Sequence, residues 1–260
     1  MIRREIQIFN QPPCWLLITQ LEHARLCGVL AEHCLPEFDK PFRQELMQAI
    51  VHHDDGWADW ELAPQIDPDH GRPYSFRELP LADSLAIWRK SINASAEYGN
   101  IAGWVVAQHF LALLGKGDSA HEETSIKWQD EITSLADSYF STWQQADLTR
   151  NTKTLALEGL AWLQLLDMLS LWLCSVCAGA KEESVPDRES FLFAASNQQL
   201  ETWCHFKQHH VSFEPWPFEQ ATIEVSANGW LIPIRPYETT LKISEVGESH
   251  EIRWRINQAS

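Results

Sequence analysis

The most apolar stretch of the chain, residues 155–180, constrains the fold more than any other feature. It reads LALEGLAWLQLLDMLSLWLCSVCAGA and is long enough to cross a membrane. Glu158, Gln164 and Asp167 interrupt it, and a charged or strongly polar side chain inside a bilayer is costly. We therefore expect a buried core helix over about residues 154–177, in a protein without a membrane partner.

Helical signals recur before this stretch. Thr19 followed by Glu22 has the form of a capping box, which predicts a helix through about Cys34. Pro41 suits the first turn of a second helix, which the apolar spacing carries up to the histidines at residue 52. The same periodicity predicts three more helices, over residues 83–98 with Asp83 as N-cap, 100–114 and 124–146.

Strand signals lie at the two ends of the chain. Residues 1–18 read as a hairpin around the turn NQPP, and residues 222–234 read as two strands around an Asn-Gly turn. The segments TLKISEV and EIRWRI alternate as strands do. These patterns predict a mainly α protein, with a helical domain over residues 14–210 and a small β appendage over residues 211–260, which strands from residues 1–18 join.

Charge and cysteine usage limit the partners and the compartment. The 20 basic and 36 acidic residues give a net charge of -16, which would repel a phosphate backbone, so we expect no nucleic-acid polymer as a partner. A small phosphorylated molecule held by a metal is compatible with this charge. The first residues do not form a secretory signal, and six cysteines without one suggest reduced thiols in the cytoplasm.

The segment AIVHHDDGW, residues 49–57, places metal-competent side chains where the second helix should end. His53 and Asp54 fall where free carbonyls and the negative end of the helix dipole favour a cation. Imidazole and carboxylate groups suit divalent ions such as Zn, Fe, Mn or Mg. Taken alone, the doublet is also compatible with a solvated helix end.

Two residues on other helices strengthen the metal interpretation. His23 lies on the first predicted helix and shares a face with Gln20 and Cys27. Asp167 is a lone carboxylate in the most apolar helix, so it should face a cation, a histidine or several donors. An ordinary buried carboxylate, hydrogen-bonded to a neighbouring helix, is the alternative.

Residues 61–80, ELAPQIDPDHGRPYSFRELP, form an unusually long predicted loop beside these residues. Trp57 and Tyr74 could form an apolar wall for a flat substrate group, although core packing explains most tryptophans. Arg72 and Arg77 could meet a substrate phosphate, although solvated loop cations are more common.

The order His23, then His53-Asp54, then Asp167 resembles the H...HD...D pattern of the HD-domain superfamily of metal-dependent phosphohydrolases. The segments ITQLEHARLCG, HHDDGW, GRPYSF and LQLLDMLSL resemble more specifically an uncharacterised bacterial family of HD-like proteins, over roughly residues 14–178. The resemblance implies an HD-domain-like helical bundle in which His23, His53, Asp54 and Asp167 hold one divalent ion, either Fe, Mn, Ni, Zn, Co or Mg. Trp57 stands where many members have a lysine.

The function that this resemblance implies is metal-dependent hydrolysis of a small phosphorylated compound, a phosphomonoester or a nucleotide-like molecule, by a metal-activated water. Asp54 or Asp55 would act as general base, and His109 would serve as an additional ligand or as a donor to the leaving oxygen. The alternative is a non-catalytic HD-fold protein that binds a ligand or a partner. A homo-oligomer is compatible with either.

Overall fold

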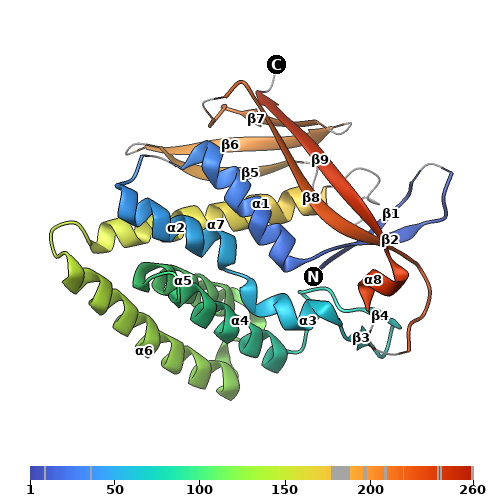
Figure 1. Cartoon of the computed structure of the whole chain (residues 1–260), viewed down its shortest axis with the longest axis horizontal. Helices are drawn as coiled ribbons and strands as arrows, with labels where there is room; N and C mark the ends of the chain where they lie inside the picture. Colours follow the sequence, from blue (N-terminus) through green and yellow to red (C-terminus); the bar gives the residue numbers. More distant parts are fainter. Residues whose placement is uncertain are drawn as a thin grey trace.

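The computed structural model describes residues 1–8, 10–35, 37–176, 188–195, 198–207, 210–218, 220–238, 240 and 242–258. It consists of a layer of helices and a large sheet that lies over one side of them (Figure 1). The helices are α1 Gln20–Cys34, α2 Lys40–His52, α3 Ala58–Leu62, α4 Leu81–Ala96, α5 Asn100–Lys116, α6 Glu123–Ala146, α7 Lys153–Ser175 and α8 Ile243–Val246. The strands are β1 Ile2–Ile6, β2 Cys14–Ile18, β3 Ile66–Asp67, β4 Arg72–Pro73, β5 Arg188–Ala195, β6 Gln198–Lys207, β7 His210–Glu214, β8 Thr222–Pro233 and β9 Glu248–Gln258.

The helices follow the sequence signals within a few residues, but the predicted N-cap Asp83 is wrong, because α4 begins at Leu81 with Pro80 at its N-cap. The Thr19 hydroxyl accepts a hydrogen bond from the backbone N–H of Glu22 at 3.1 Å, so the predicted cap of α1 is confirmed. The Glu22 carboxylate does not return to Thr19 in the capping-box manner. It accepts instead from the backbone N–H of Asn228 at 2.6 Å, which fastens the first turn of α1 to β8.

The apolar helix α7 is a core helix. It packs against α1, α2, α5 and β5. Among the described residues it is the helix long and apolar enough to cross a membrane, but 61% of its most apolar window is buried within the protein. This burial agrees with the predicted core helix.

The sheet overturns the predicted fold class. Seven strands form one mixed, curled sheet in the order β1-β2-β8-β9-β7-β6-β5, in which β7 and β9 pair in parallel and the other neighbours are antiparallel. The prediction of a mainly α, HD-domain-like bundle with a small sheet is therefore wrong, and so is the description all-alpha, because the chain forms an α/β fold.

The missed strands lie between residues 188 and 214, which the sequence analysis left without structure. In β7, Val211 and Phe213 are fully buried while their neighbours His210 and Glu214 are exposed, so this strand carries the alternation that marks a half-buried sheet. The predicted domain boundary after residue 210 falls at the start of β7, and the division into two domains stays a prediction.

Two local predictions near the C-terminal end are also wrong. The Asn228-Gly229 pair is not a turn, because β8 runs through it without a break. A Cβ atom at Gly229 would lie 2.7 Å from Leu16 Cδ1 and 3.0 Å from the Leu17 carbonyl oxygen, so the glycine permits the close approach of β2. The segment TLKISEV contains the short helix α8 in place of a strand, and Ile243 is buried there.

Four helices bring the candidate residues together. α1 contacts both α2 and α7, and α5 contacts both α2 and α7. The long apolar faces of α5 and α7 supply this packing, with fully buried side chains that include Val105, Leu166 and Leu169. The four helices therefore surround one point in the core.

Candidate metal centre

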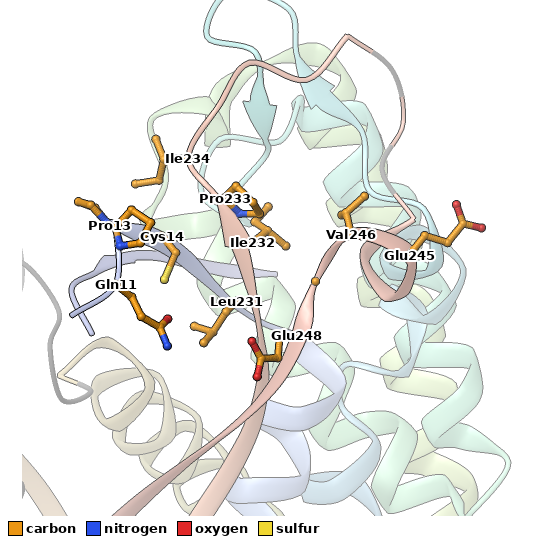
Figure 2. A pocket seen from close by; sticks show the side chains of 12 residues that line it. Gln11, Pro13, Cys14, Leu231, Ile232, Pro233, Ile234, Glu245, Val246 and Glu248 are labelled. Atoms are coloured by element: carbon orange, nitrogen blue, oxygen red, sulfur yellow. The ribbon is translucent and has the colours of Figure 1, made fainter. Parts of the chain in front are cut away.

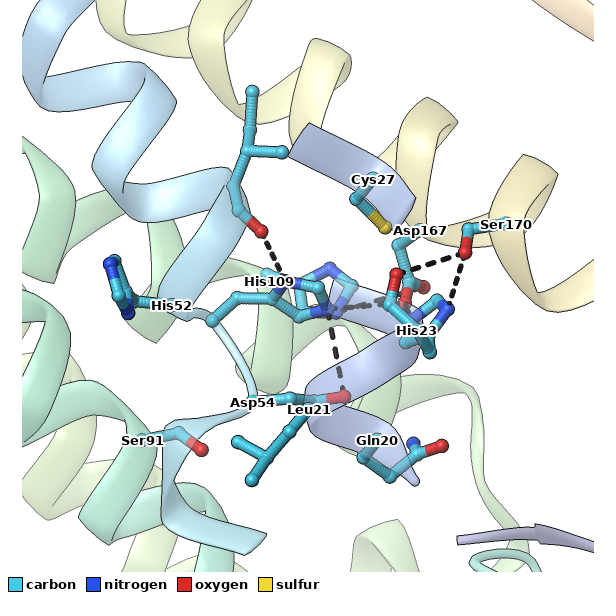
Figure 3. Close-up of polar contacts among 12 residues, drawn as sticks. Gln20, Leu21, His23, Cys27, His52, Asp54, Ser91, His109, Asp167 and Ser170 are labelled. Carbon is cyan, nitrogen blue, oxygen red and sulfur yellow. Dashed lines mark hydrogen bonds and ion pairs between the residues drawn. The ribbon is translucent and has the colours of Figure 1, made fainter. Parts of the chain in front are cut away.

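A buried polar cluster occupies the point where the four helices meet (Figure 3). His23 comes from α1, His53 directly follows α2, His109 comes from α5 and Asp167 comes from α7. Asp54 follows His53. All five are buried, with His23 and His53 fully inaccessible and Asp167 only 7% exposed. The structure thus brings together the four residues predicted as ligands, and His109 beside them.

Asp167 lies at the centre of this cluster. Its Oδ1 is 2.9 Å from His23 Nε2 and 3.5 Å from His53 Nε2, and its Oδ2 is 3.8 Å from His109 Nε2. Asp54 Oδ2 is 3.6 Å from His53 Nε2. The longer separations exceed a hydrogen bond. They match the spacing of two ligands on one tetrahedral ion, about 3.4 Å when each ligand lies about 2.1 Å away.

Hydrogen bonds outside the cluster orient two of the imidazoles. Ser170 Oγ donates to the backbone oxygen of His23 at 3.0 Å, so the same Oγ accepts the Nδ1 proton of His23 at 2.8 Å. His53 Nδ1 donates to the backbone oxygen of Ile50 at 2.8 Å. Both Nε2 atoms therefore face the carboxylates, and in a neutral ring of this tautomer Nε2 is the nitrogen that can bind an ion, which is the arrangement of metal-ligating histidines.

His53 Nε2 is the most informative atom of the cluster. It is buried and has no hydrogen-bond partner among the described residues. Burial lowers the pKa of His53, but the nearby Asp54 and Asp167 carboxylates outweigh it and raise the pKa to about 9. The two carboxylates therefore create a strongly negative potential at the His53 ring. A proton on the ring takes the place that a metal cation could occupy.

The two carboxyl groups differ in their electrostatics. Burial raises the pKa of Asp54 more than the nearby His53 and His23 lower it. Burial also acts to raise the pKa of Asp167, but the hydrogen bond with His23 and the nearby His53 and His109 rings outweigh it and hold that pKa well below its usual value. Asp167 is thus the permanent anion of the cluster.

His109 contributes a neutral ring. Its burial lowers its pKa to about 4, because the Asp167 carboxylate only partly offsets the loss of water. Its Nδ1 is also buried without a hydrogen-bond partner among the described residues. A neutral imidazole with a lone pair can serve as a ligand or, through its N–H, as a hydrogen-bond donor.

The other two residues of the HHDD segment, His52 and Asp55, face away from the cluster. His52 Nδ1 lies 2.9 Å from Asp55 Oδ2, and the His52 ring stacks on Tyr98 at 4.4 Å between centroids. Figure 3 shows His52 directed away from the other histidines. Asp55, predicted as a catalytic candidate, is therefore paired with a partly exposed histidine outside the cluster.

The predicted substrate-binding residues lie in a separate aromatic and ionic region. Trp57 is 2% exposed and packs with Leu79 and Ile87, with Tyr74 at the edge of this group. Arg72 forms its ion pair with Glu78 at 3.0 Å, and the Arg77 guanidinium lies over the Phe76 ring at 5.4 Å. These side-chain contacts join the loop to α4 and include no residue of the histidine cluster.

A pocket at one end of the sheet also lies apart from the cluster. It has a volume of about 570 Å³ and is open to solvent, at the sheet end formed by β2, β8 and α8 (Figure 2). Cys14, Ile232 and Val246 are among the residues that line it. None of the residues that line this pocket belongs to the cluster.

Ser170 is the functional candidate that sequence reasoning missed. It lies three residues after Asp167 on α7, so the two share a helix face. That spacing was the available signal, but a serine in an apolar helix more often bonds to its own backbone than to a histidine.

A model of the family described as "Protein of unknown function (DUF3891)" matches residues 1–233. The chain belongs to the DUF3891 family. No curated protein and no solved structure matches it. The DUF3891 match ends with the last residue of β8 and includes every residue of the histidine cluster. The family match confirms the prediction of an uncharacterised family. It does not support membership of the HD-domain superfamily. The seven-stranded sheet also differs from the helical bundle that the resemblance to this superfamily implied.

Proposed function

We propose that this DUF3891 protein is a metal-dependent hydrolase of a small phosphorylated compound, either a phosphomonoester or a nucleotide-like molecule. In this proposal His23, His53, Asp54 and Asp167 hold one divalent ion. The observation that carries it is the His53 Nε2 atom, which is fully buried, lacks a hydrogen-bond partner among the described residues and lies 3.5 to 3.6 Å from two carboxylates. A buried polar atom without a partner is costly unless something binds it.

The donor set fits a divalent ion. Two neutral imidazoles and two carboxylates balance a charge of +2, and they combine ligands that Fe, Mn, Ni, Zn, Co and Mg accept to different extents. Ser170 and the Ile50 carbonyl hold the outer nitrogens of the two rings, as outer-shell groups do in metal proteins.

When bound, such an ion supplies a hydroxide by lowering the pKa of a water to about 7, and it polarises a phosphoryl oxygen. Asp54, which is 4% exposed, would accept a proton from the attacking water, whereas Asp55 is engaged with His52. The neutral His109 ring serves as a further ligand or as a donor to the leaving oxygen.

The charge of the chain supports a small substrate. A net charge of -16 disfavours a nucleic-acid polymer, while a phosphorylated metabolite can be held by the ion itself. We further propose a cytoplasmic location, on the cysteine content noted above, and the homo-oligomer stays a prediction.

The test combines metal analysis with a phosphoester screen. Purified protein is analysed for bound metals and then assayed on nucleotides and generic phosphomonoesters with Mn, Fe, Ni, Co, Zn or Mg added. Asp54→Ala should lose most of the metal and of the hydrolysis, whereas the matched control Asp55→Ala should keep the metal, because Asp55 points to His52.

Retention of metal by Asp54→Ala would refute its assignment as a ligand. A wild-type protein that binds metal but hydrolyses none of the phosphoesters would favour the alternative, a non-catalytic protein that binds a ligand or a partner.

A further inference from the structure

A cysteine thiol lies against the same histidine cluster. Cys27 is four residues after His23 on α1, so both side chains lie on one helix face, and Cys27 is fully buried. One ring nitrogen of His23, one of His53 and the Cys27 Sγ all lie within 4.8 Å of one another. Figure 3 shows the thiol on the side of the cluster where α1 faces α7.

We propose that Cys27 Sγ is a further ligand of the metal centre, together with His23 and His53. This inference rests on the proposed function, which requires a bound ion. It adds a statement of which class of metal ion the centre should bind. Sulfur ligands favour Zn, Fe, Co and Ni over the hard ions Mg and Mn, so the centre should select a sulfur-accepting metal.

The case for a ligand does not depend on the cysteine alone. His53, one of the three residues in this group, has a fully buried Nε2 atom without a hydrogen-bond partner among the described residues. The Cys27 thiol donates to the Leu166 carbonyl oxygen at 3.4 Å. A thiol is a weak donor, so an ion can replace this contact at little loss.

Coordination changes the protonation of the thiol. Burial and the negative charge of Asp167 raise the pKa of Cys27, so the thiol keeps its proton in the absence of an ion. A coordinating thiol is deprotonated by the metal, and its proton leaves to solvent. The S–H bond breaks, the sulfur–metal bond forms, and no oxidant or reductant takes part.

Cobalt(II) provides a direct probe, because a cobalt-bound thiolate gives a sulfur-to-metal charge-transfer band in the near ultraviolet. Wild-type protein titrated with cobalt(II) should show this band and resist displacement of the cobalt by Mg. Cys27→Ser should lose the band while still binding cobalt through the histidines and carboxylates.

Cys34→Ser is the matched control. Cys34 lies on the same helix, and its thiol also donates to a carbonyl oxygen, that of Leu30 at 3.1 Å. The band should persist in this variant, and its loss there would overturn the assignment to Cys27.

X-ray absorption of zinc-loaded wild-type protein gives a second measurement that needs no variant. We expect a sulfur neighbour at about 2.3 Å from the zinc. Bound metal with only nitrogen and oxygen neighbours would overturn the Cys27 assignment and leave the proposed function standing. Failure of the wild type to bind cobalt or zinc at all would overturn both.

Discussion

Two carboxylates in this protein each lie beside several side-chain nitrogen atoms, and they do so in opposite ways. Glu78, on the loop before α4, accepts from Arg3 with both oxygens at 2.8 and 2.9 Å, from Arg72 at 3.0 Å and from the backbone N–H of Ser75 at 2.9 Å. Asp167 has His23 at 2.9 Å but meets His53 and His109 only at 3.5 and 3.8 Å.

The two groups differ in whether their polar atoms all have hydrogen-bond partners. The Glu78 group closes on itself, since each of its carboxylate oxygens has two donors at hydrogen-bonding distance, and it holds β1, β4 and the loop together without any further atom. The Asp167 group is buried, yet His53 Nε2 and His109 Nδ1 in it have no hydrogen-bond partner among the described residues. A self-contained ion pair therefore indicates structure, whereas a buried, incomplete one indicates a ligand that completes it.

Removal of the metal should have the largest effect on stability, and it should act on the Asp167 group but not on the Glu78 group. If the free metal concentration is a thousand times its dissociation constant, a chelator should remove about 4 kcal/mol of stability from the wild type. Asp54 and Asp167 would then repel each other without their cation. Thermal melts with and without chelator measure this shift.

Asp167→Asn is the control for the chelator experiment. It keeps the size and the hydrogen-bonding capacity of the side chain but removes the charge, so its melting temperature should respond far less to the chelator. An equal shift in both proteins would exclude Asp167 from direct contact with the ion.

The adjacent histidines offer the next contrast. His53→Ala should reduce metal affinity by more than the roughly 10- to 100-fold expected for an outer-shell residue, because it removes a donor atom. His52→Ala should leave the affinity unchanged and destabilise by less than about 1 kcal/mol, since it loses an exposed ion pair and a ring stack. Isothermal titration with zinc compares them, and similar affinities would contradict the orientation described for His53.

A smaller effect is expected at Ser170. Ser170→Ala removes the acceptor for His23 Nδ1, so the ring loses its fixed tautomer, and the metal affinity should fall about 10- to 100-fold. Ser138→Ala, at an exposed position of α6, serves as a control for serine removal. An unchanged affinity in Ser170→Ala would show that the packing of α1 and α7 alone orients His23.

The smallest effect should come from the Glu78 group, in which each carboxylate oxygen already has two donors. Partial burial acts to raise the pKa of Glu78, but the Arg3 and Ser75 hydrogen bonds outweigh it and leave the pKa below 4.5. A carboxyl with a lowered pKa stabilises the fold above its unfolded-state pKa, and this contribution is lost as pH falls through the folded-state value. Glu78→Gln should therefore cost about 1 kcal/mol or less at neutral pH.

The difference between Glu78→Gln and wild type should vanish in acid, and it should shrink in high salt. Chelator should not alter it. Urea titrations at several pH values provide the measurement, and a chelator-dependent difference would show that the two groups are coupled.

The local signals in the sequence account for the helices better than for the sheet. Thr19 caps α1 through a neighbour three residues away, so the pattern is visible within one helical turn. The pairing of β7 with β9, and of β2 with β8, joins segments that are distant in sequence. No local pattern in the sequence indicates such a pairing. At Asn228-Gly229, a glycine that makes room for β2 looks the same in the sequence as a glycine in a hairpin turn.

The site shows the same division. Asp167 was predictable because a carboxylate in an apolar helix requires a partner. The separation of His53-Asp54 from His52-Asp55 was not, because it depends on the backbone at Asp54, where φ of -111° and ψ of 14° leave the helical conformation. That turn sends one histidine-aspartate pair inward and leaves the other at the surface.

The pairing of β2 with β8 also determines the order in which the molecule can be assembled during synthesis. Leu16, Leu17 and Ile18 are fully buried in the finished protein, yet Leu16 and Leu17 pair with Leu231 and Trp230, which emerge from the ribosome nearly a whole chain later. Closing so long a loop is slow, and an unpaired apolar strand is prone to association in the meantime. Helix α1, which carries His23 and Cys27, contacts β8 and therefore acquires this sheet support only after β8 has been made.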